Sequence, residues 1–204
     1  MENSLENAQT KRKLSLEEKR IVKSFENIPF ERLVDRARLI LVWRKLKQAT
    51  DFVFNTPVDD LQLKNIKSII EKAGLFFKCE VKEGESRQAC FVADNQNDLE
   101  LVLKLWSSTT LYDRDVQFGR LFGFPQTAIE AYDKNSVDSK AGKKSKYLLT
   151  LDEMDEKVPK DLIPYCLLML SRANWEQELK TVKRWADEIK LVDPALYKAI
   201  SNQL

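Results

Sequence analysis

Apolar residues recur at helical spacing over most of the chain, whereas dense aromatic and β-branched segments typical of strands are confined to a short central region. From Phe30 to Leu46 apolar side chains return every three or four residues with Arg and Lys between them, which predicts a basic amphipathic helix. The Ser15-Leu-Glu-Glu18 pattern matches a capping box and predicts an earlier helix start. Pro57 and Asp59-Asp60 predict the start of a third helix, which Gly74 ends.

Two strand-like segments lie on either side of Gly84. Leu75–Lys82 and Arg87–Ala93 are aromatic and β-branched, which predicts an antiparallel hairpin at about 75–93. Because a two-stranded ribbon is marginal in water, we expect the hairpin to pack on helices or to gain a third strand. Tyr147–Leu151 is the obvious candidate for that strand.

The segment Phe118–Tyr132, which we call the corner motif, holds two of the five glycines of the chain and a proline. Gly123 is predicted to adopt a positive φ and to end a helix that runs in from about Leu111. Pro125 presets φ for the first turn of the next helix, Gln126–Tyr132. This pattern predicts a tight helix-turn-helix-like corner, but by itself it names no chemistry.

The rest of the chain is predicted to be helical or irregular. Asn97-Asp98 is expected to cap a helix over Leu99–Trp106, and Asn174 to cap one of three C-terminal helices, at 161–172, 175–189 and 194–200. The predicted fold is α+β and mainly helical, with a small antiparallel hairpin-centred sheet packed on helices and a C-terminal helical subdomain. The expected organisation is a flexible tail at 1–14, an α+β domain at 15–133, an exposed basic loop at 134–146, and a C-terminal strand and helices at 147–204 packed on the same domain.

Composition narrows the class of protein. The chain has 204 residues, 43% of them hydrophobic, and no apolar run approaches the roughly 20 residues that span a bilayer. The polar N-terminus lacks the apolar core of a signal peptide, so we expect a soluble cytoplasmic protein that does not enter membranes. Three cysteines are an odd number, which favours reduced, buried thiols, although Cys79 and Cys90 lie in the two hairpin strands and could face each other. Their spacing predicts no metal site.

The chain contains no histidine. This excludes His-based triads, Cys-His nucleophile pairs and the commonest zinc ligand. An enzyme built on this sequence would use carboxylates, Lys, Tyr or Cys. Nucleotide-binding signatures such as GxxxxGK[ST] and GxGxxG are absent, and no cofactor is predicted. The balance favours a binding protein over an enzyme.

The corner reads Phe118-Gly-Arg-Leu-Phe-Gly-Phe-Pro125. Together with the preceding hairpin and helix, from Cys79 to Tyr132, it resembles a family of uncharacterised archaeal and bacterial proteins with a Gly-Arg-Leu-Leu-Gly-Tyr-Pro-type corner. In that family two adjacent cysteines often follow the proline, whereas this chain has Thr127-Ala128 there, so a paired-cysteine site is not carried over. The resemblance supports the fold and implies no activity.

Three functional hypotheses follow. The first is a non-catalytic binding or interaction module for an unknown protein partner. The second is nucleic-acid binding, because Met1–Lys47 carries twelve Lys and Arg against seven Asp and Glu; the phosphate-contacting candidates are Arg32, Arg36, Arg38, Arg44, Lys45 and Lys47. Solvated helix faces explain these charges equally well.

The third hypothesis is a small-ligand binder or a histidine-free enzyme with a pocket at the corner. Its candidate ligand-binding residues are Gly119, Arg120, Gly123, Glu130 and Tyr132. The structural alternative is an Arg120–Glu130 ion pair with the corner phenylalanines in the core.

The C-terminal helix face that carries Trp175 and Trp185 packs either in the core or against a second copy of the chain.

Overall fold

The computed structural model describes residues 13–81, 87–108, 111–140 and 146–203, with backbone only for 111–113 and 136–140. Its elements, in chain order, are α2 (Leu16–Ser24), the 3-10 turn η1 (Phe25–Asn27), α3 (Leu33–Trp43), β1 (Ala49–Phe54), α4 (Asp60–Lys72), β2 (Phe76–Val81), β3 (Gln88–Ala93), α5 (Gln96–Ser107), α6 (Leu111–Leu121), α7 (Gln126–Lys140), α8 (Leu151–Lys157), the 3-10 turn η2 (Lys160–Tyr165), α9 (Trp175–Val192) and α10 (Pro194–Ser201). The predicted fold class, α+β and mainly helical with a small antiparallel sheet on helices, is confirmed.

The sheet has three antiparallel strands in the order β1-β3-β2. The predicted hairpin forms β2 and β3, but the expected third strand at 147–151 is wrong. β1 takes that place, while Leu148 makes one isolated bridge to Ser171. The physical reason lies in the next residues, because Thr150 and Glu153 form a capping box that starts α8 and ends the extended segment.

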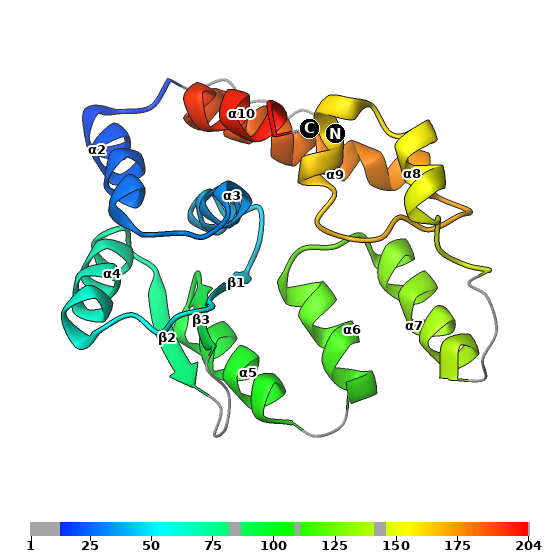
Figure 1. Ribbon diagram of the computed structural model, residues 1–204, viewed down its shortest axis with the longest axis horizontal. Helices are drawn as coiled ribbons and strands as arrows, with labels where there is room; N and C mark the ends of the chain where they lie inside the picture. Colours follow the sequence, from blue (N-terminus) through cyan, green and yellow to red (C-terminus); the bar gives the residue numbers. More distant parts are fainter. Residues whose placement is uncertain (1–12, 82–86, 109–110, 141–145, 204) are drawn as a thin grey trace, which may run out of the picture.

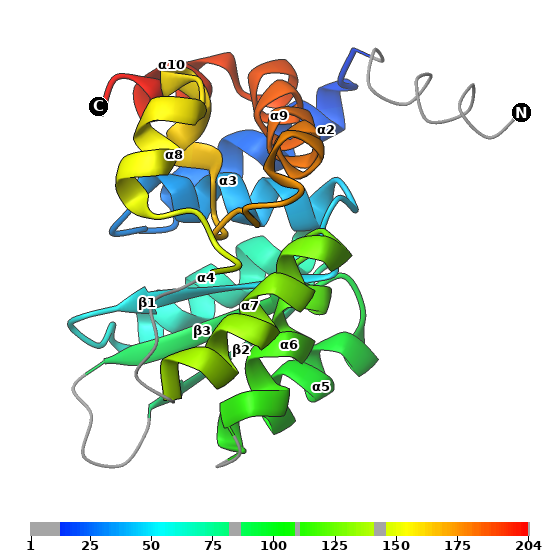
Figure 2. The same cartoon turned by 90° about the vertical axis from the view of Figure 1, so that its right-hand side faces the viewer.

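Helices cover both faces of the sheet (Figure 1). One face packs on α5 and α6 through a small apolar cluster centred on Phe91, and the other packs on α3 and α4 through the main core. α9 and α10 pack on α3, so the C-terminal helices lie in one layer with α2 and α3 while the sheet and α4–α7 form the other (Figure 2). The ring of Trp185 lies fully buried in the main core.

Local sequence signals place most helix starts. The Ser15–Glu18 capping box and the Asp59 cap, which accepts from the Gln62 amide at 2.8 Å, are both formed. The start of α5 lies earlier than predicted, because Asn95 rather than Asn97 caps the helix by accepting from the Asp98 amide at 2.9 Å. Asn174 occupies the N-cap position of α9 without capping it through its side chain.

Two further predictions need correction. The helix expected at 161–172 ends after the turn η2. Backbone groups beyond the turn form hydrogen bonds with residues 147–149 and not within a helix, because the Leu149 amide donates to the Leu170 carbonyl at 2.9 Å. The loop expected at 134–146 is helical up to Lys140, as α7 continues, and 141–145 lie outside the described residues. Polar composition does not stop a helix that lacks Gly or Pro.

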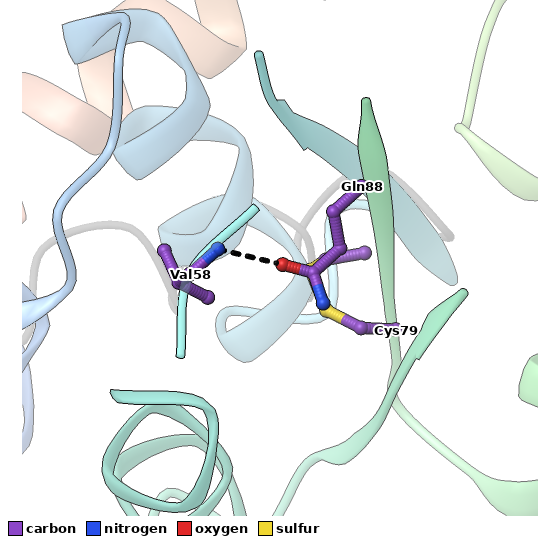
Figure 3. The surroundings of a disulfide bond; sticks show 4 residues. Val58, Cys79 and Gln88 are labelled. Carbon is purple, nitrogen blue, oxygen red and sulfur yellow. Dashed lines mark hydrogen bonds between the residues drawn. A yellow bond between two sulfur atoms is a disulfide. The ribbon is translucent and has the colours of Figure 1, made fainter. Parts of the chain in front are cut away.

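Cys79 and Cys90 form a disulfide, which corrects the expectation of reduced thiols (Figure 3). The two residues lie directly opposite each other in the β2–β3 register, and beside them Gln88 accepts a hydrogen bond from the Val58 amide at 3.2 Å. Cys166 is free, and burial raises the pKa of its thiol to about 12. Among the described residues no cluster of acidic or Cys side chains could hold a metal ion, and no helix is long and apolar enough to cross a membrane.

Candidate functional site

The corner motif turns sharply at Gly123, as predicted. Its φ is +70°, and the Phe124 amide donates to the Gly119 carbonyl at 2.9 Å, which closes the end of α6. The turn docks on the residues before β1, because the Gln48 amide donates to the Leu121 carbonyl at 3.0 Å. A Cβ at Gly123 would lie 3.0 Å from the Leu46 carbonyl oxygen, so another residue here would have to displace the Leu46 backbone as well as hold a positive φ.

A cavity of about 540 Å³ lies beside this turn. Its walls come from α3, β1, β3, α5, α6, the corner, α7 and the extended segment Leu167–Met169. Most of the lining is apolar and much of it is aromatic, in pairs such as Phe91 with Trp106 (ring centroids 5.3 Å apart) and Phe118 with Phe122 (5.5 Å). This volume is in the range of sites that take small organic molecules.

Charged groups from α3 and β1 form one polar side of the cavity. Arg38 Nη1 lies 3.3 Å from an oxygen of buried Asp35 and 3.8 Å from Asp51, while Arg32 makes two bonds to Asp35, of 3.0 and 2.8 Å. Arg32, Arg38 and Asp51 line the cavity, and the buried residue Thr50 lies next to Asp51. Burial raises the pKa of the Asp51 carboxyl, against the opposing pull of the Arg38 charge.

A second polar group comes from α6 and α7. Arg114 Nε lies 3.3 Å from Asp115 Oδ1, and the Tyr132 hydroxyl donates to Asp115 Oδ2 at 3.3 Å. Burial and the neighbouring Asp115 carboxylate raise the pKa of Tyr132, because both disfavour a second negative charge. All three residues line the cavity.

Lys47 lies at the boundary between the cavity and the core. It lines the cavity but is only 4% exposed, and its Nζ donates to the Phe122 carbonyl. The same Nζ lies 3.8 Å from the ring centroid of Trp185 and 4.9 Å from that of Phe124. Burial, and then the nearby Arg38 charge, lower the pKa of Lys47 well below its ordinary value, although Asp51 opposes the shift.

The structure separates the predicted ligand-binding residues into two groups. Gly119 and Tyr132 line the cavity, whereas Gly123, Arg120 and Glu130 do not. The alternative ion pair between Arg120 and Glu130 is not formed; Arg120 is exposed, and Glu130 accepts from Gln126 Nε2 at 3.0 Å. The corner phenylalanines pack partly in the core and partly on the cavity.

The predicted phosphate-contacting residues have intramolecular partners. Arg32 and Arg38 pair with Asp35. The others pair as follows: Arg36 with Glu26 and Asp193, Arg44 with Glu18 and Glu188, and Lys45 with Asp94, while Lys47 is buried. Three of the six, Arg32, Arg38 and Lys47, instead line the same cavity as Gly119 and Tyr132, so residues from two separate hypotheses come together in one site.

Sequence reasoning missed Thr50, Asp51, Trp106, Arg114, Asp115 and Leu167–Met169, which also line the cavity. One signal was present, since Asp51 interrupts the apolar run of β1. A carboxylate within a half-buried strand is an unusual choice unless it is paired or functional.

Comparison with protein-family models, with curated proteins and with solved structures finds no match to this chain. Thr127 donates to the buried carboxylate of Glu178 at 2.7 Å, and Ala128 lines the cavity.

Proposed function

We propose that the protein binds a small organic anion with a flat apolar body in the cavity beside the corner motif. The observation that carries the proposal is the combination of aromatic walls with guanidinium groups whose donors are only partly used. The cavity of about 540 Å³ accommodates such a ligand and lies within one chain.

The unused donors belong to Arg38 and Arg114. Arg38 contacts its carboxylates through Nη1 alone, and Arg114 contacts Asp115 through Nε alone, which leaves further N–H groups on both side chains without an acceptor among the described residues. These side chains are 19% and 21% exposed. An anion that accepts from both guanidinium groups would gain charge-assisted hydrogen bonds, which are stronger than those between neutral groups.

The apolar part of the ligand is recognised by the aromatic pairs. Phe91 with Trp106, and Phe118 with Phe122, present ring faces and edges on which a flat molecule can stack. A free basic surface for nucleic acid is not supported, since the six candidate cations have intramolecular partners.

Calorimetric titration with a matched pair of probes tests the proposal. The probes are 4-(hydroxymethyl)benzoate, with its two-ring biphenyl analogue, and the primary amides of both. We expect the acids to bind and the amides to bind at least about tenfold more weakly, because a hydrogen bond to a charged group contributes about 1.5–3 kcal/mol.

Variants on one helix supply the control. Arg114→Gln removes a cavity guanidinium and is expected to weaken acid binding on the order of tenfold or more. Arg120→Gln removes an exposed cation of the same helix outside the cavity and is expected to leave binding unchanged. Equal effects of the two substitutions, or equal affinity for acid and amide, would refute an anion site in the cavity.

A further inference from the structure

The buried amine of Lys47 has no carboxylate within ion-pair distance in the part of the chain that the structure describes. Among the described residues its Nζ makes no ion pair, and its contacts are the Phe122 carbonyl and the rings of Trp185 and Phe124. The charges that act on it are those of Arg38 on α3, which lowers its pKa, and of Asp51 on β1, which raises it. A lysine buried in this way would be expected to cost stability, because its charged form is desolvated and lies near another cation.

The same surroundings make an amine nucleophilic. Only the uncharged amine carries the lone pair that attacks a carbonyl carbon, and desolvation together with a neighbouring cation raises the fraction of uncharged amine at neutral pH. Lys47 itself lines the cavity, as do Phe122 and Phe124, which contact its Nζ, so the side chain belongs to the wall of the space that a ligand would occupy. The direction of the Lys47 pKa shift agrees with this geometry.

We propose that Lys47 captures an aldehyde or ketone group of the ligand as an imine. The uncharged Nζ attacks the carbonyl carbon to form a C–N bond, and the carbonyl oxygen takes up a proton. The resulting carbinolamine loses its hydroxyl group as water while the nitrogen gives up its hydrogens, so amine and carbonyl become imine and water. No oxidant or reductant takes part.

Loss of water from the carbinolamine needs a proton donor, and Asp51 is the candidate for this role. It lines the same cavity and is four residues from Lys47 along the chain. Because its surroundings favour the protonated carboxyl more than water does, it can deliver a proton to the departing hydroxyl group and recover one from the nitrogen.

The proposal rests on the proposed function, since it names a reactive group of the same ligand, and reductive trapping tests it. The probe is 4-carboxybenzaldehyde, with its two-ring analogue, incubated with the folded full chain and sodium cyanoborohydride at pH 7.4. The adduct is located by peptide mapping with mass spectrometry. An ordinary lysine has about 0.1% uncharged amine at this pH, and each unit by which the pKa falls raises that fraction about tenfold.

We expect the adduct on Lys47 to form at least about tenfold faster than on any other lysine, and this selectivity to vanish in urea. Lys47→Met, which keeps the length and apolar stem, should lose the selective adduct while its circular dichroism and melting remain those of a folded chain. Asp51→Asn should slow trapping at saturating 4-carboxybenzaldehyde, where the rate of adduct formation no longer depends on how tightly the cavity binds the probe.

The two proposals fail separately. Adducts spread over other lysines with none on Lys47, while 4-(hydroxymethyl)benzoate still binds, would overturn imine formation and leave the anion site standing. Selective labelling of Lys47 without binding of 4-(hydroxymethyl)benzoate would support imine formation by the Lys47 amine and would refute the anion site. Labelling of Lys47 no faster than of other lysines in the folded protein would also overturn the proposal.

Discussion

Replacing Gly123 by alanine tests the physical reason for the turn beside the cavity. Two costs arise in the folded state. A non-glycine residue at φ +70° loses about 1–2 kcal/mol relative to its ordinary conformations. The new Cβ would in addition lie 3.0 Å from the Leu46 carbonyl oxygen, a backbone atom that cannot turn away.

Gly74 supplies a matched control. Its φ of +78° imposes the same conformational cost on alanine, but nothing lies within 4 Å of the added Cβ. In both variants the unfolded chain loses entropy, which returns about 0.4–1 kcal/mol. We therefore expect Gly74→Ala to destabilise by roughly 1 kcal/mol, and Gly123→Ala by about 1–3 kcal/mol more, the usual cost of forcing atoms into a packed site.

Urea unfolding followed by far-UV circular dichroism measures the difference. With a slope of about 2 kcal/mol per molar urea, the Gly123→Ala midpoint should fall below that of Gly74→Ala by about 0.5–1.5 M. Coincident midpoints would refute the reasoning, because they would show that the approach of Leu46 to the corner contributes nothing beyond the φ requirement.

Two other predictions concern stability. Reduction of the Cys79–Cys90 disulfide, which spans a sequence separation of 11, should lower the free energy of unfolding by about 3 kcal/mol, the loop entropy that the unfolded chain regains. Urea midpoints with and without dithiothreitol measure this change. A Cys79→Ser/Cys90→Ser chain should no longer respond to the reductant. Hydrogen bonds from Arg172, and then from the Thr150 amide, lower the pKa of Glu153 to about 2. The ionised carboxylate therefore stabilises the folded protein at pH values above the pKa that Glu153 has in the unfolded chain, and this stabilisation is lost as the pH falls toward 2. Glu153→Gln should accordingly melt below the wild type at pH 7 and together with it near pH 2, and a gap that stays constant with pH would contradict this.

Signals within a few residues predicted the local structure well. The caps at Ser15 and Asp59, the β2–β3 hairpin and the positive φ at Gly123 each depend on side chains or backbone close in sequence. β1 was missed because it follows closely on an amphipathic helix and because its pairing with β3 joins residues about forty positions apart. Propensity carries no information on such a contact.

The cavity could be predicted only in fragments, for the same reason. Gly119 and Tyr132 were named as ligand candidates and Arg38 as a phosphate contact, yet nothing local indicates that they share one space. That proximity follows from the docking of the corner on Gln48 and from the packing of Leu167–Met169 into the wall of the same cavity. Both are long-range packing events, which periodicity does not report.

The position of Leu167–Met169 in the cavity wall determines when, during synthesis of the chain, the cavity can be complete. α3 and β1 leave the ribosome early, but one wall of the cavity is missing until residues 167–169 follow, and the Trp185 ring that covers the Lys47 amine comes later still. During that interval the amine is in water and behaves as an ordinary lysine. A ligand that recognises the closed cavity would bind only the completed chain and would hold its C-terminal helices in place, with a stabilisation that grows with the logarithm of ligand concentration.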